Sequence, residues 1–139
     1  MKKFLLILFT LHFSLLTFAQ PNWAKNASKS VFTLKTFSAD GSLIASSNGF
    51  FTGANGEAIS NFTPFKGAAR AVIIDAAGKE IAVTGMIGAN EMYDVAKFRV
   101  AGKTRPLVVA TGIAQSGERV WLLPYLETKN LQNGIVRKA

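Results

Sequence analysis

The side chains that could carry chemistry in this chain are carboxylates and hydroxyls. The 139 residues include no cysteine and a single histidine, His12. The lack of cysteine excludes disulfides, thiol nucleophiles and thiolate metal sites. Because His12 lies in an apolar N-terminal stretch, the rest of the chain cannot build a Ser-His-Asp or Cys-His arrangement, nor a histidine-based zinc site.

The acidic residues are the remaining candidates for metal or acid-base chemistry. Their spacing does not match a calcium-binding loop, and we expect neither a metal ion nor another cofactor. The eight acidic residues are Asp40, Glu57, Asp75, Glu80, Glu91, Asp94, Glu118 and Glu127.

Ser116 precedes Gly117 in a turn-like stretch that lacks the Gly-x-Ser-x-Gly context of a nucleophile elbow.

Residue type alone gives Thr63 and Asp94 structural roles. Thr63 precedes Pro64, and a hydroxyl at such a loop position typically bonds to nearby backbone. Asp94 precedes an apolar stretch, where a carboxylate is typical of a turn or of the start of a strand.

Residues 1–19 have the pattern of a secretory signal peptide. Lys2 and Lys3 precede a Phe/Leu-rich run that closes on the small residues Thr17 and Ala19, as before a cleavage site. The apolar run is too short and too close to the N-terminus for a membrane anchor. We therefore predict cleavage after Ala19, export to the periplasm, cell envelope or exterior, and no membrane span.

The exported chain is predicted to be basic without a basic patch. Removal of Lys2 and Lys3 from the 16 basic residues leaves 14, against eight acidic residues. These basic residues are scattered singly, apart from the neighbouring Arg137 and Lys138. Because a nucleic-acid footprint requires clustering, we expect no nucleic-acid partner.

Short β-strands are the elements expected to position the candidate side chains. Asn55-Gly56 is predicted to form a two-residue hairpin turn between two of them. Gly49 suggests a bend or a close backbone approach within the first, and Pro64 ends the second. The expected strands are 30–37, 42–52, 57–62, 70–75, 80–87, 93–100, 105–110, 119–125 and 131–136.

This pattern predicts an all-β fold, an antiparallel barrel of six or seven strands with little or no helix. Residues 20–29 are a polar lead that either docks on the barrel or frays. A domain of this size needs its aromatic side chains inside. The aromatic residues expected in the core are Phe50, Phe51, Phe62, Phe65 and Trp121.

The stretch from Gly49 to Ala68 resembles a segment of the trypsin-like serine peptidases, in particular their bacterial high-temperature-requirement group. The usual form there is Gly-Ser-Gly-Phe, a Gly-containing turn, then Thr-Asn-x-His-Val-Val-x-Gly-Ala. Residues 60–68 read Ser-Asn-Phe-Thr-Pro-Phe-Lys-Gly-Ala. Later stretches also resemble that family, among them residues 70–85, 93–100 and 131–136.

The resemblance implies a peptidase fold without peptidase chemistry. Thr63 stands at the position of the catalytic histidine, and Asp94 at that of the triad aspartate. No Gly-Asn-Ser-Gly-Gly nucleophile segment occurs in the chain. The implied division is a signal peptide at 1–19, a lead at 20–29, the first barrel at 30–130, and the start of a missing second barrel or a C-terminal tail at 131–139.

The function implied is that of an exported, catalytically inactive peptidase-like domain that binds an unknown protein or peptide. It acts alone or as the front part of a larger envelope protein. Two alternatives remain open. One is a truncated member of a serine endopeptidase family, and the other is a small secreted β-barrel that binds peptides by strand addition.

Two structural expectations follow from the resemblance. Thr63 and Asp94 should approach one another, with the hydroxyl bonded to the carboxylate directly, at roughly 2.5–3.0 Å, or through one water. Residues 131–139 lack their usual neighbours from a second barrel, so we expect self-association through this segment.

Overall fold

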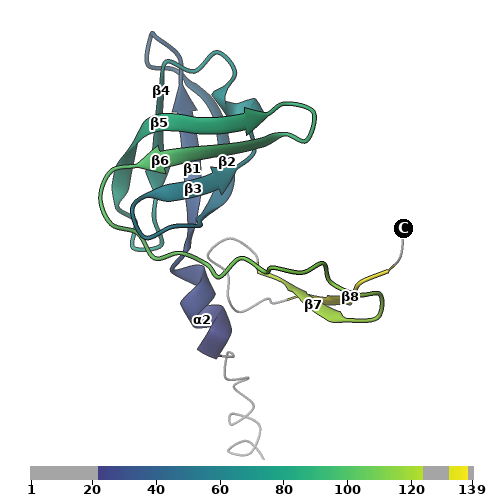
Figure 1. Cartoon of the computed structure of the whole chain (residues 1–139). Helices are drawn as coiled ribbons and strands as arrows, with labels where there is room; N and C mark the ends of the chain where they lie inside the picture. Colours follow the sequence, from purple (N-terminus) through teal and green to yellow (C-terminus); the bar gives the residue numbers. More distant parts are fainter. Residues whose placement is uncertain (1–21, 124–131, 138–139) are drawn as a thin grey trace, which may run out of the picture.

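Six antiparallel strands close into a barrel in the order β1-β2-β3-β6-β5-β4 (Figure 1). The structure is a computed structural model that describes residues 22–123 and 132–137. The all-β fold class and the antiparallel barrel predicted from the sequence are confirmed. The barrel strands are β1 (Val31–Phe37), β2 (Leu43–Phe51), β3 (Glu57–Ser60), β4 (Arg70–Ile74), β5 (Glu80–Asn90) and β6 (Val95–Val100).

The barrel interior is filled by alternate side chains of these strands. In β1 every second residue is buried, as expected for a strand with one face on the core. Aromatic rings meet at the centre, where Phe32 lies 4.9 Å from Phe51 and 6.0 Å from Phe98 between ring centroids. The buried core consists of Phe32, Leu34, Phe51, Ala58, Ala71, Ile73, Ala96, Phe98 and Val100.

The backbone at Gly49 lies close to neighbouring atoms, as predicted. A Cβ atom at this position would lie 2.5 Å from both the Ile59 carbonyl oxygen and the Phe32 ring. Only glycine fits between this ring and the neighbouring strand.

The prediction of a two-residue Asn55-Gly56 turn is wrong. The connection from β2 to β3 spans residues 52–56, and Gly56, with φ of 86°, has the left-handed conformation while Asn55 does not. Gly56 is fixed from outside the loop, since its carbonyl accepts from the Val100 N–H at 2.9 Å and its N–H donates to the Thr104 hydroxyl at 3.0 Å. These contacts with the end of β6 and the segment after it override the local turn preference.

Two other expectations about strands are corrected. Residues 105–110 form no strand, because the six strands already close the barrel and Pro106 lacks an N–H donor. The strand predicted at 119–125 is β7 (Arg119–Leu122), which pairs outside the barrel with β8 (Gln132–Ile135). Residues 124 and 125 lie outside the described part of the chain.

The segment before the barrel, predicted to be a polar lead, contains a short helix, α2 (Asn22–Ser28), which agrees with the little helix expected. Trp23 of α2 lies 6.0 Å from Trp121 of β7 between ring centroids. Trp121 was expected in the core but is 44% exposed, because β7 is not a barrel strand. Phe62 and Phe65 pack against the core as expected, and both are partly buried.

Among the described residues, no helix has the length and apolar character needed to cross a membrane. The predicted signal peptide at 1–19 lies outside the described residues, so its prediction stands untested.

Candidate functional site

The pairing of β3 with β6 brings Thr63 and Asp94 together. Ser60 is the last residue of β3 and is opposite Ala96, close to the start of β6. The chain beyond Ser60 therefore runs past the residues that precede β6. There Thr63 begins a single 3-10 turn, η1 (Thr63–Phe65), and Pro64 supplies the fixed φ that suits its start. Asp94 has a φ of 51°, the left-handed conformation that aspartate tolerates better than most residues.

The Asp94 carboxylate accepts three hydrogen bonds. One oxygen accepts from the Thr63 backbone N–H at 2.6 Å and from the Thr63 hydroxyl at 2.8 Å. The other accepts from the side-chain amide of Asn61 at 3.0 Å. The direct contact between the Thr63 hydroxyl and Asp94, expected from the sequence, is confirmed.

These donors lower the pKa of Asp94 below its ordinary value of 3.8. The Thr63 N–H is the largest cause, followed by the Thr63 hydroxyl, since each stabilises the charged carboxylate. An aspartate held in this way is ionised at neutral pH and is a weak base.

A cavity of about 240 Å³ lies beside this carboxylate. Asn61 links Asp94 to β2. Its side-chain amide donates to Asp94, and its side-chain oxygen accepts from the Ser47 hydroxyl on β2 at 3.2 Å. The lining residues are Asn48, Gly49, Phe50, Ile59, Ser60, Asn61, Tyr93, Asp94 and Val95.

The hydroxyls in and beside this cavity are engaged in hydrogen bonds. The Ser60 hydroxyl is bound to the Asn61 carbonyl oxygen at 2.9 Å. The Thr63 hydroxyl is bound to Asp94, whose lowered pKa makes it a poor proton acceptor at neutral pH. The site can present hydrogen-bonding groups to a ligand.

The other candidate residues are separated from this site. Ser116 lies in the turn that leads into β7, in the two-stranded sheet outside the barrel. Within residues 22–123 and 132–137, no group of three His, Cys, Asp or Glu residues could hold a metal ion.

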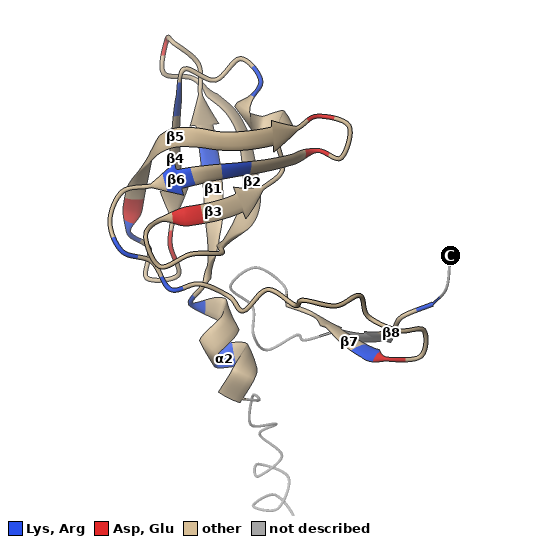
Figure 2. Ribbon diagram, viewed as in Figure 1, with Lys and Arg blue, Asp and Glu red and all other residues tan. Residues whose placement is uncertain are grey.

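Most of the described acidic residues have structural partners. The hydroxyl of Ser38, then the N–H of Ser42, lower the pKa of Asp40 to about 2. Asp75 accepts from the N–H groups of its own hairpin turn. Glu57 pairs with Lys97 and Arg99 across the β3–β6 ladder, at 3.2 and 3.5 Å. Figure 2 shows acidic and basic residues spread over the strands and turns of the barrel.

Sequence reasoning missed Asn61 and Ser47 as members of the site. Neither residue has a local signal, because the contact of Asn61 with Asp94 depends on the β3–β6 register. A prediction of that register would have placed Asn61 beside the start of β6.

No family model matches this chain, and no curated protein matches it.

Proposed function

We propose that this protein is an exported, non-catalytic domain of the trypsin-like kind that acts by binding a protein or peptide. Its barrel corresponds, in this proposal, to the N-terminal barrel of the high-temperature-requirement-type peptidases, with Thr63 in place of the catalytic histidine and Asp94 as the remaining triad residue. The closed six-stranded antiparallel barrel supports this assignment. So does the bond between Thr63 and Asp94, which the resemblance led us to expect.

The observation that carries the binding role is the exposed apolar surface at the β5–β6 hairpin. Met92 is 86% exposed and Tyr93 is 74% exposed, although both are large apolar side chains. Met86, Ile87 and Val95 are also exposed on the same two strands. Because exposed apolar side chains gathered in one region often mark a protein-binding site, we name these five residues the hairpin surface. The hairpin surface adjoins the cavity beside Asp94, because two of its residues, Tyr93 and Val95, also line that cavity.

Binding by strand addition is supported by the free edge of β5. The ladder between β4 and β5 ends at Ala82, whereas β5 pairs with β6 as far as Asn90. Among the described strands, residues 84–90 of β5 therefore have a ladder partner on one side only. Register shifts between Val83 and Gly85 and between Met86 and Gly88 interrupt this stretch, and such irregularities limit unspecific pairing.

A selection from a library of displayed extended peptides tests the binding role. The wild-type protein should enrich apolar peptides, and a variant with Met92→Lys and Tyr93→Lys should lose at least about tenfold in affinity for them. The matched control is Lys79→Gln, on the turn between β4 and β5. Failure to enrich any peptide, or enrichment that the double variant retains, contradicts the role.

Strand addition has its own test. N-methylation of alternate backbone amides in an enriched peptide removes the ladder donors without changing its side chains. We expect this to abolish binding if the peptide pairs with β5. If the methylated and unmethylated peptides bind equally well, strand addition is ruled out, and the peptide binds the hairpin surface through side-chain contacts alone.

The absence of catalysis is tested with the purified protein and with Thr63→His. We expect neither to hydrolyse casein or peptide esters, because the substitution supplies a base and no positioned serine nucleophile. Turnover that a serine-reactive phosphonate abolishes would show that a nucleophile has been overlooked.

A further inference from the structure

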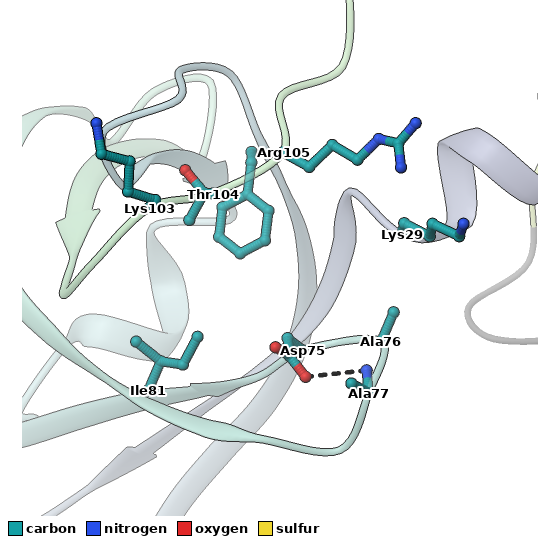
Figure 3. Close-up of a pocket in the computed structure, with 9 residues that line it drawn as sticks. Lys29, Asp75, Ala76, Ala77, Ile81, Lys103, Thr104 and Arg105 are labelled. Atoms are coloured by element: carbon teal, nitrogen blue, oxygen red, sulfur yellow. Dashed lines mark hydrogen bonds between the residues drawn. The ribbon is translucent and has the colours of Figure 1, made fainter.

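A second and larger cavity lies next to the end of α2 and the β4–β5 turn (Figure 3). Its volume is about 440 Å³, within the range typical of small-molecule sites. It shares no lining residue with the cavity beside Asp94. The lining residues are Lys29, Phe51, Asp75, Ala76, Ala77, Ile81, Lys103, Thr104 and Arg105.

The floor and one wall of this cavity are apolar. Phe51 belongs to the buried barrel core and is 3% exposed, while Ile81 is partly buried against that core. Ala76 and Ala77 form the wall on the β4–β5 turn, where their small side chains leave the space open. This end of the barrel therefore offers a preformed surface for a hydrocarbon group.

Three cationic side chains line this cavity. Lys29 and Arg105 lie on the α2 side of the cavity, and Lys103 extends from the other side (Figure 3). In the described part of the chain, none of the three forms a salt bridge with a carboxylate. The contact of Arg105 with the Asn26 side-chain oxygen is long, at 3.5 Å. These positive charges are thus available to a bound anion.

The single carboxylate of the cavity is already engaged. One oxygen of Asp75 accepts from the backbone N–H of Ala77 at 2.9 Å and from that of Lys79 at 2.8 Å. These bonds hold the carboxylate against its own turn, and the lining has three cationic side chains against this one carboxylate.

Hydrogen bonds to the barrel fix the segment that supplies two of the cations. The Thr104 N–H donates to the Ala54 carbonyl at 3.0 Å, and the Thr104 hydroxyl donates to the Gly53 carbonyl at 2.6 Å. The Leu107 N–H donates to the Phe51 carbonyl at 2.8 Å. These bonds hold the wall in place before any ligand arrives, which reduces the entropic cost of binding.

We propose that this cavity binds a small amphipathic carboxylate, with its hydrocarbon part on Phe51 and Ile81 and its carboxylate between Lys29 and Arg105. At about 30 Å³ for each water-sized group, the cavity has room for up to roughly fifteen heavy atoms, enough for a ligand of about ten heavy atoms with some water beside it. A medium-chain acyl carboxylate has this size, and its single negative charge complements the cationic rim. This inference does not depend on the proposed protein-binding role.

Isothermal titration calorimetry of the purified protein with octanoate tests the proposal. Octanoate should bind at least about tenfold more tightly than octanol or octylammonium, because only the carboxylate pairs with the rim. Its affinity should fall at high salt, since the rim is exposed to solvent and the ion pairs are screened. Tighter binding of octyl phosphate than of octanoate would contradict the assignment of a carboxylate.

Two variants separate the head and tail contacts. Lys29→Gln with Arg105→Gln should weaken octanoate binding about tenfold and leave octanol binding unchanged. Ala76→Phe, at an exposed position of the turn, should fill the space and abolish binding of octanoate and octanol alike. Lys79→Gln, on the same turn but outside the lining, is the matched control.

Thermal unfolding of each variant shows whether it is folded under the titration conditions. Octanoate binding that neither folded variant weakens, equal binding of octanol and octanoate to the wild type, or no heat of binding at all would overturn the proposal. If a variant fails to fold, competition between octanoate and octylammonium in the wild type decides between a carboxylate site and a purely apolar one.

Discussion

Asp94 combines an unusual backbone conformation with an engaged side chain. It has the left-handed φ of 51°, and its carboxylate accepts three hydrogen bonds from Thr63 and Asn61. These bonds connect the end of β3 to the start of β6. The residue therefore fixes the relative position of the two loops that border the smaller cavity.

The Asp94→Asn variant isolates the charge, because asparagine also tolerates the left-handed conformation. We expect the substitution to lower the Tm at neutral pH by a few degrees, since the amide is a weaker acceptor for the Thr63 donors. The measurement is the Tm of wild type and variant across a pH series, followed by circular dichroism.

The pH dependence of this difference has a defined sign. Because folding lowers the pKa of Asp94 below 3.8, its charge stabilises the folded state above that pH. The contribution is lost as the pH falls through the lower pKa of the folded state. The Tm difference should therefore be full at neutral pH and should shrink in acid below the ordinary aspartate pKa. A difference that does not change with pH would contradict this account.

Glycines with positive φ have different costs of substitution. Gly56, with φ of 86°, would place a Cβ atom 2.2 Å from the Val100 carbonyl oxygen. Gly78, with φ of 81°, would place one in open space. We expect Gly56→Ala to destabilise the protein by about 3 kcal/mol or more, and the matched control Gly78→Ala by about 1–2 kcal/mol. Urea unfolding at equilibrium measures both values, and similar losses would show that the loop relaxes around the new methyl group.

At the scale of the elements, the sequence indicated most of the barrel strands because each carries a local signal. β1 is rich in β-branched and aromatic residues, and the hairpin of β4 and β5 encloses Gly78. Asp75 supports that hairpin through bonds to the backbone of its turn. Such signals are contained within a few residues and need no knowledge of the remaining chain.

The features that sequence reasoning missed depend on distant contacts. The β2–β3 loop takes its conformation from Val100 and Thr104, which follow it by more than forty residues. Residues 105–110 have a strand-like composition, yet the barrel closes without them. The bond between Thr63 and Asp94 was accessible only through the family resemblance, because the two residues meet through the pairing of β3 with β6.

At the scale of the whole molecule, β7 and β8 form a two-stranded sheet beside α2 and apart from the barrel (Figure 1). Val120, Trp121, Leu122 and Ile135 of this sheet are exposed. A hairpin of two strands gains little stability alone and presents free edges. Further packing against its exposed side chains would therefore stabilise it.

We expect this hairpin to promote dimerisation or aggregation in concentrated solution. Deletion of residues 131–139 should reduce it, and sedimentation velocity measures the change. Ile135→Lys is the less disruptive variant, because it keeps the strand and adds a charge to an exposed position. A monomer at high concentration that neither change affects would contradict the prediction.

The contact between Trp23 and Trp121 makes fluorescence and circular dichroism report on different parts of the protein. These are the only two tryptophans of the chain, and neither belongs to a barrel strand. Tryptophan emission should follow the separation of α2 from β7, whereas the far-ultraviolet signal should follow loss of the barrel. If the hairpin of β7 and β8 detaches before the barrel unfolds, the emission will change at a lower urea concentration than the ellipticity. A single midpoint fitted to the fluorescence would then underestimate the stability of the barrel.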